Sequence, residues 1–441
     1  MKQILPKIGI TRYRYHMRIN SILRPRFKQH LSLFILSAIC VVVFGLNGEM
    51  FLSSLTAHFK EKILYQFGAP IVEKMQKADK YQFDLRSFLE PYRSIANRVD
   101  GMLADHAAAV AFLARSDNKI GVYLNSESVA DEDFFRATLG SLEAAGGNAL
   151  VFDVKGAYVY FESSSPLAKE LELVRPLYDL PGIVAEARAR GFYTIARLIA
   201  AKDPILSSYN PDTRIRHPIT NASVGFEWVD LSSPKVLEYN RQVMIDVVLS
   251  GVDEINIDYI RYPTEYHQSS IGLTKDEKAE RIETFIRMAR SVIDQYNTPT
   301  KLGVSTYAIL GWNYDVNVKP LGQDVVRFAP YLDVISPMAY PSTFKLGGYY
   351  NPNEHPRSRM YYLVYRTLTG YAEILGEEHA YKLRPWIQGY YVTQKNMRDQ
   401  MDAVFDAGYC GFTVWSAGNH YDKVYKLIPE VDIPERCTSY I

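Results

Sequence analysis

The feature that most limits what this chain can fold into is a repeated alternation of strand and helix patterns that begins at Lys119. Eight short, largely apolar segments have the composition of buried β-strands: residues 119–125, 148–154, 192–199, 253–259, 301–307, 332–338, 383–389 and 410–416. Helical periodicity follows each of them, at residues 132–145, 180–190, 235–250, 275–296, 322–329, 358–375 and 394–407, with a last short stretch from about 420. Strands that alternate with helices in this way predict a parallel sheet.

Eight strand–helix units over roughly 310 residues match the number and the size range of a (β/α)8 barrel. A doubly wound open sheet is the alternative, but such sheets usually have fewer strands, and no glycine-rich phosphate-binding turn follows the first strand here. The sequence therefore predicts an α/β chain with a TIM barrel over residues 118–430, followed by a C-terminal tail at 431–441.

The fourth predicted strand ends in a carboxylate, in the stretch 253-DEINIDYIRYPTE-265. Side chains of a barrel strand alternate between the interior and the helix layer. This alternation predicts that Glu254, Asn256 and Asp258 point inward. It predicts that Ile255, Ile257 and Tyr259 point outward. Asp258 then lies at the carboxyl end of the strand, where barrel enzymes carry their chemistry. Glu254 enters at the other end and is expected to be structural. A structural role for Asp258, paired with Arg197 or Arg261, is the alternative.

Polar and aromatic residues gather at the other predicted strand ends as well. The second strand closes in 151-VFDVKG-156, the third is followed by 196-ARLIAAKDP-204, and the last three end in 336-SPMAYPS-342, 386-WIQGYY-391 and 415-WSAGN-419. These ends share one face of the barrel. For each residue a hydrogen-bonding rim position without chemical role is the alternative. The candidates are Asp153 and Asp203 for catalysis, and Lys155, Arg197, Lys202, Arg261, Tyr340, Gln388 and Asn419 for substrate binding.

All four tryptophans fall at the same predicted face: Trp228 after strand three, Trp312 after strand five, Trp386 on strand seven and Trp415 on strand eight. Large flat rings with a polar edge suit a ligand with apolar C–H faces and many hydroxyls, which describes a sugar ring. The alternative for Trp386 and Trp415 is that they fill the top of the barrel.

Glycoside hydrolysis requires paired carboxylates on different strand ends, one as acid and one as nucleophile or base. Asp258 is the first member. The residues near the rim that could supply the second are Asp153, Asp203, Glu227, Asp230 and Glu265.

Other chemistries have weaker sequence support. The nine histidines form neither an HxH nor an HExxH pattern, so no metal site and no cofactor are expected. No G-x-S-x-G segment offers a serine nucleophile. Cys410 begins the eighth strand, at the face away from the site, so cysteine catalysis is not expected.

The first 117 residues have a different organisation. Residues 1–30 carry eight basic residues and no acidic ones, and residues 31–48 form an uncharged apolar run long enough to cross a hydrocarbon core of ~30 Å. The positive-inside rule predicts a cytoplasmic arm, a single transmembrane anchor and an extracytoplasmic barrel, with a cleaved signal peptide as the competing interpretation. Residues 49–117 have helical spacing and are expected to form a stalk or a lid.

Charge and cysteine content agree with that placement. Without the arm the chain has 42 basic and 49 acidic residues, and an acidic domain argues against a nucleic-acid partner. Cys40 lies in the apolar run, so Cys410 and Cys437 can form at most one disulfide, and stability must come from a large core.

The stretches 191-GFYTIARLIAAKDP-204, 251-GVDEINIDYIRYP-263, 333-DVISPMAYPS-342, 384-RPWIQGYY-391 and 411-GFTVWSAGN-419 resemble, in order and spacing, a glycoside hydrolase family of bacterial TIM barrels that is otherwise catalogued as a domain of unknown function. The likeness covers about residues 118–428. It implies a carbohydrate site, with the family's motif positions falling on Asp153, Lys155, Arg197, Lys202, Asp203, Asp258, Arg261, Met338, Tyr340, Ser342, Trp386 and Gln388.

The chain departs from that family pattern at two places. Gly156 and Ala157 follow the second strand where a further acid is expected in many relatives, and Tyr307 stands on strand five where an Asp is expected. Two hypotheses therefore remain. The first is a membrane-anchored extracytoplasmic hydrolase that cleaves a cell-envelope or exopolysaccharide with two carboxylates. The second is a non-catalytic polysaccharide-binding barrel.

Overall fold

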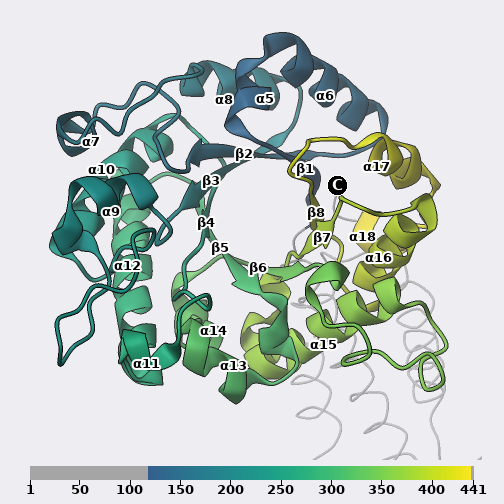
Figure 1. Ribbon diagram of the computed structural model, residues 1–441. Coiled ribbons are helices and arrows are strands. Elements are labelled where there is room, and N and C mark those ends of the chain that lie inside the picture. Colours follow the sequence, from purple (N-terminus) through teal and green to yellow (C-terminus); the bar gives the residue numbers. More distant parts are fainter. Residues whose placement is uncertain (1–117, 439–441) are drawn as a thin grey trace, which may run out of the picture. The chain divides into compact units, whose positions relative to one another are not determined.

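The computed structural model describes residues 118–438, and within them eight parallel strands close into one barrel in chain order (Figure 1). The strands are β1 (Ile120–Leu124), β2 (Ala149–Lys155), β3 (Tyr193–Ile199), β4 (Glu254–Asp258), β5 (Lys301–Tyr307), β6 (Val334–Ala339), β7 (Trp386–Gln388) and β8 (Phe412–Trp415). β8 pairs with β1 from Ile120↔Phe412 to Val122↔Val414, which completes the ring. The predicted TIM barrel is confirmed.

The helices form the outer layer around this ring (Figure 1). The longer ones are α6 (Glu132–Ala144), α8 (Leu180–Ala189), α10 (Pro234–Leu249), α12 (Lys275–Tyr296), α13 (Tyr314–Leu321), α15 (Arg359–His379) and α16 (Gln394–Asp406). Short helices lie between them and at the C-terminal end: α5 (Ser126–Ala130), α7 (Pro166–Glu170), α9 (Pro204–Tyr209), α11 (Gln268–Ile271), α14 (Val325–Phe328), α17 (Asp422–Leu427) and α18 (Glu435–Thr438).

The segment after β5 differs from its prediction. In place of one helix over residues 322–329, α13 ends at Leu321 and α14 covers only Val325–Phe328. Gly322 between them has φ 71°, a left-handed conformation that ends a helix and that glycine adopts without steric cost. Asp324 then starts α14 by accepting a hydrogen bond from the backbone N–H of Arg327.

The interior of the barrel follows the alternation predicted for β4. Ile255 and Ile257 are buried against the helix layer, while Glu254, Asn256 and Asp258 point inward. Glu254 is fully buried at the amino end of the strand, where its Oε1 lies 2.6 Å from Nη2 of Arg384. This buried ion pair agrees with the structural role expected of Glu254.

A layer of neutral polar groups separates that ion pair from the carboxyl end of the barrel. The Oδ1 of Asn256 accepts a hydrogen bond from Ser305 at 2.7 Å, and Trp386 donates its Nε1–H to the same serine at 2.9 Å. The barrel interior is therefore packed in layers, as in other TIM barrels, and Trp386 separates this packed part from a cavity at the carboxyl end.

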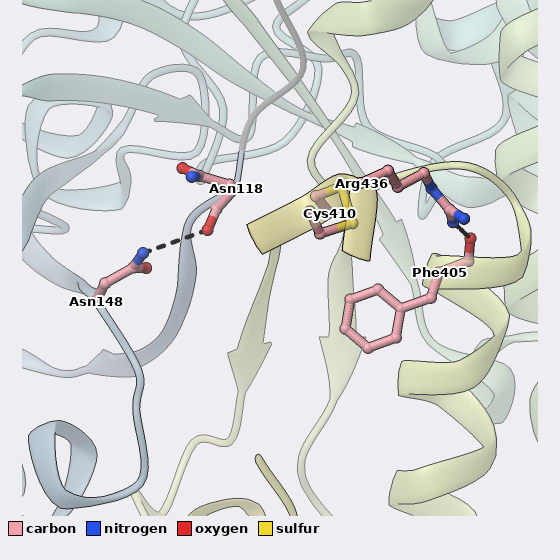
Figure 2. Close-up of a disulfide and its surroundings, with 6 residues drawn as sticks. Asn118, Asn148, Phe405, Cys410 and Arg436 are labelled. Carbon is pink, nitrogen blue, oxygen red and sulfur yellow. Dashed lines mark hydrogen bonds between the residues drawn. A yellow bond between two sulfur atoms is a disulfide. The ribbon is translucent and has the colours of Figure 1, made fainter. Parts of the chain in front are cut away.

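The C-terminal segment closes the amino end of β8. Cys410 and Cys437 form a disulfide that joins α18 to the residues before β8, and Arg436 donates to the carbonyl of Phe405 near the end of α16 (Figure 2). The predicted pairing of the two cysteines is confirmed. Because Val431 and Cys437 are buried, the segment predicted as a tail from 431 is packed against the barrel as far as Cys437.

The expected arm (1–30), anchor (31–48) and stalk or lid (49–117) lie outside the described residues. Within residues 118–438 no helix combines the length and the apolar composition needed to cross a bilayer.

Replacing Arg384 by Met is expected to destabilise the barrel by about 3–5 kcal/mol, because it leaves the Glu254 carboxylate buried without its partner. Urea unfolding followed by circular dichroism measures this. The control is Arg398→Met, which removes an ion pair with Glu430 that is mostly exposed to water and is expected to cost about 1 kcal/mol or less. Equal losses for the two variants would contradict a structural role of the inner pair.

Candidate active site

A cavity of about 140 Å³ opens at the carboxyl end of the barrel. A cavity of similar volume in another protein core holds a benzene molecule, so this one has room for a single six-membered ring. The residues that line it are Arg197, Asp258, Tyr259, Arg261, Tyr307, Gln323, Met338, Tyr340, Trp386 and Trp415. Seven of the residues predicted from sequence are brought together here or in direct contact with it, namely Asp153, Arg197, Asp258, Arg261, Tyr340, Trp386 and Trp415.

Asp258 is the carboxylate in the lining of this cavity. Its Oδ2 accepts a hydrogen bond from Nε of Arg197 at 2.9 Å and lies 2.7 Å from Nη2 of the same residue, and its Oδ1 accepts the backbone N–H of Tyr259 at 2.6 Å. Charge-assisted contacts of this kind are stronger than neutral hydrogen bonds. Asp258 is thus held through both of its oxygens.

Asp153, at the end of β2, is joined to Asp258 through the same arginine. Arg197 donates Nη1–H to the Oδ1 of Asp153 at 2.6 Å, and Tyr123 donates its hydroxyl to Oδ2 at 2.6 Å. A guanidinium with a hydrogen bond on either side spans roughly 8 Å at most, so the two carboxylates are no farther apart than the widest separation used by two-carboxylate glycosidases.

Burial changes the proton affinity of Asp153 and of Arg197 in different ways. Burial raises the pKa of the Asp153 carboxyl above its ordinary value, and the hydrogen bonds from Arg197 and Tyr123 offset this only in part. Burial disfavours the charged form of Arg197 too, but the two carboxylates outweigh it and raise its pKa. Asp153 therefore holds a proton more readily than a carboxyl group in water does.

Aromatic rings form the wall of the cavity on the β1, β6 and β8 side. Trp415 stacks on Tyr340 with ring centroids 5.8 Å apart and on Tyr123 with centroids 6.2 Å apart. Trp386 closes the floor and is 2% exposed. Both roles predicted for Trp386 and Trp415 are therefore found: they fill the top of the barrel, and they present ring surface to the cavity.

The opposite wall is built on the turn after β4. Tyr259 has φ 51°, a left-handed backbone conformation that is uncommon for a bulky residue. Beside it the Arg261 guanidinium lies 4.6 Å from the ring of Trp228, 4.8 Å from that of Tyr307 and 5.7 Å from that of Tyr259. The turn thus brings a cation and one phenol ring to the cavity next to Asp258, and the end of β5 adds the ring of Tyr307.

Lys155 and Asp203 are brought together, but away from the cavity lining. Both side chains are fully buried, and Lys155 Nζ lies 2.9 Å from Asp203 and 2.8 Å from the carbonyl of Ile199. Asp203 also accepts the N–H of Leu206 at the start of α9. These contacts tie β2 to the loop after β3. Lys202 is half-buried and lies 3.6 Å from Glu227, also outside the lining.

Four further predicted binding residues lie in supporting positions. Trp228 is fully buried beneath Arg261. Trp312 donates its Nε1–H to Thr367 at 3.0 Å and packs against Phe344. The Oε1 of Gln388 accepts the N–H of Ser342, and Asn419 donates to the carbonyl of Tyr123 across the junction of β8 and β1.

The two departures from the family pattern also have places in the structure. Tyr307 lines the cavity, and burial raises the pKa of its hydroxyl, so it is a neutral phenol rather than an acid. A Cβ on Gly156 would lie 2.4 Å from the hydroxyl of Tyr160, so an acid at this position would require Tyr160 to move.

Sequence reasoning did not assign Tyr123, Tyr259, Tyr307 or Gln323 to the site. Tyr123 stands at an inward position near the end of β1, so strand parity carried a signal for it. The outward position predicted for Tyr259 is wrong: its backbone has φ 51°, which ends the strand alternation, and the residue lines the cavity. Gln323 reaches the site from the segment after β5, where its Oε1 accepts the N–H of Tyr307. No periodicity marks such a loop residue.

A family model described as "Putative glycosyl hydrolase domain" matches residues 121–421. No curated protein matches the chain. Among solved structures, the endo-1,4-beta-D-mannanase of Thermotoga petrophila has 12% identity and a TM-score of 0.50, covering 71% of this chain and 99% of that chain. The beta-galactosidase of the psychrophilic Marinomonas ef1 has 12% identity and a TM-score of 0.50, covering 73% of this chain and 58% of that chain.

At these identities the solved structures show the fold alone, and the chain spans little more than half the length of the beta-galactosidase. The family match extends over most of the chain and includes β1 to β8. It confirms the resemblance drawn from the strand-end motifs. The chain belongs to this family, the one described as "Putative glycosyl hydrolase domain".

Proposed function

We propose that this protein is a membrane-anchored, extracytoplasmic glycoside hydrolase that cleaves a cell-envelope polysaccharide or an exopolysaccharide, with Asp258 as the carboxylate that faces the sugar. One observation carries the proposal. Asp258 lies at the carboxyl end of β4, in the lining of an aromatic-walled cavity that has room for a sugar ring.

The proposed chemistry divides two roles between two carboxyl groups. Cleavage of a glycosidic bond needs a proton for the leaving oxygen and a carboxylate that either attacks the sugar carbon or activates water. Asp153 is the candidate for the proton donor, since burial raises its pKa. Asp258 is the candidate for the carboxylate. Arg197 would have to release its contact with Asp153 for that proton to reach the sugar, because Asp153 is outside the cavity lining.

A polysaccharide-binding barrel is the second candidate function, and specific contacts favour it. Both oxygens of Asp258 already accept hydrogen bonds, and Tyr307 occupies the place where an Asp is expected in relatives. In that case the same cavity would hold a sugar without cleaving it, with Asp258 and Arg261 as hydrogen-bonding groups.

The proposed location is supported by the basic arm and the apolar run of the sequence, which favour an anchor with the barrel outside. The disulfide between Cys410 and Cys437 adds support, because disulfides persist mainly in oxidising compartments.

Asp258→Asn is expected to lower glycan cleavage by about 10²–10⁴-fold, because it removes an ionisable group but keeps its size. Full-length protein purified in detergent is incubated with a panel of bacterial glycans, and new reducing ends are counted. The control is Asp294→Asn, at the far end of α12, where the side chain is 64% exposed. If the parent cleaves nothing and both proteins bind one glycan equally, the binding barrel is the better account.

Asp153→Asn tests the proton donor. If the raised pKa of Asp153 governs cleavage, activity of the parent falls as pH rises through that value, and this alkaline loss disappears in the variant. The variant should lose cleavage of natural glycans by about 10²-fold or more, yet retain cleavage of aryl glycosides whose leaving groups need no proton. Equal losses on both substrate types would instead mean that Asp153 only positions Arg197.

A further inference from the structure

Tyr391, in the turn between β7 and α16, combines two unfavourable features. Its side chain is 99% exposed, and its backbone has φ 50°, the left-handed region that a bulky residue seldom adopts. Such a conformation costs on the order of 1–3 kcal/mol when the residue is not glycine. Burial of the ring among residues 118–438 does not repay this cost, so the position points to a partner outside them.

The turn that carries Tyr391 is held by several hydrogen bonds. Gln388 accepts the N–H of Ser342 and donates to the carbonyl of Tyr390 at 2.9 Å, so it joins the turn to the loop after β6. The hydroxyl of Tyr390 lies 2.8 Å from the hydroxyl of Ser342. On the other side Lys423 donates to the carbonyl of Val392 at 2.6 Å. The exposed ring is therefore presented from a braced turn.

The ring of Tyr391 continues the aromatic wall of the cavity. Trp415, which lines the cavity, has the ring of Tyr390 edge-on at 5.4 Å, and Tyr390 in turn has Tyr391 edge-on at 5.7 Å. Tyr340 also contacts Tyr390, at 6.1 Å. An unbroken path of aromatic surface thus runs from the buried floor to the solvent on the β7 side of the barrel mouth.

We propose that Tyr390 and Tyr391 form a second sugar-binding position, where the exposed Tyr391 ring stacks on a residue of the same glycan whose neighbour occupies the cavity. This rests on the proposed carbohydrate site. The substrate class that follows is an oligosaccharide or polysaccharide chain that continues out of the cavity over the β7–α16 turn, rather than a glycoside of one sugar. A flat ring without charge suits the C–H face of a pyranose, and its neighbour Tyr390 supplies a hydroxyl at the edge.

The test is affinity electrophoresis of the full-length protein in detergent, through gels that contain galactomannan, glycol chitosan or alginate as neutral, cationic and anionic probes. Tyr391→Asn removes the ring but keeps a residue that tolerates φ 50°. Its binding in the gel that retards the parent is expected to be about tenfold weaker. Tyr391→Phe keeps the ring and should recover most of the binding lost in the Asn variant.

The matched control is Tyr209→Asn, which removes another exposed tyrosine, 64% exposed at the end of α9 and outside the cavity lining. The position is overturned if Tyr391→Asn migrates as the parent does, if Tyr209→Asn weakens binding equally, or if none of the three polymers retards the parent. It is also overturned if a membrane vesicle or another protein, and no glycan, binds in a Tyr391-dependent way.

The outcome separates this position from the hydrolase proposal. A parent that binds a polymer through Tyr391 but releases no reducing ends keeps the second position and loses the hydrolysis. A parent that cleaves a polymer with the same KM as Tyr391→Asn keeps the hydrolysis and loses the second position.

Discussion

The contact on which the site depends is the single guanidinium of Arg197 between Asp153 and Asp258. All three side chains are almost fully withdrawn from water, where unpaired charges would be very costly, so each one needs the others. One cation between two acids leaves one carboxylate without a cation of its own. Burial raises the pKa of Asp153, and Arg197 offsets this only in part.

The fold could be predicted from the sequence because the spacing of apolar residues, and the alternation of side chains along a strand, are local properties of the chain. Alternating strand and helix patterns gave the barrel, and the alternation within 253–259 separated inward Asp258 from outward Ile257. Strand ends gave the face of the site for the same reason, since all parallel strands end on one side. Helix α13 was missed because Pro320 and Gly322 indicate a loop there, and the predicted helix began at Gly322, where α13 in fact ends.

The detail of the site depended on contacts between distant segments. Trp228 is buried and Tyr391 is exposed although both are aromatic residues in loops after strands, and composition offers no means of telling them apart. Asp153 lies near the end of β2 and Asp203 follows β3, yet their partners differ. Asp203 is paired with Lys155 beside α9, and Asp153 is paired with Arg197 beside the cavity. Only packing between the loops decides which polar groups reach the ligand.

The seam where the barrel closes has its own consequence for the charges. Asn419 and Tyr421 both donate hydrogen bonds to the carbonyl of Tyr123, and they fasten the loop after β8 to the end of β1. The hydroxyl of the same Tyr123 is the group that holds Asp153. Closure of the sheet and the proton affinity of a carboxyl group therefore meet in one residue, so a loosened β1–β8 junction would also change the acidity of Asp153.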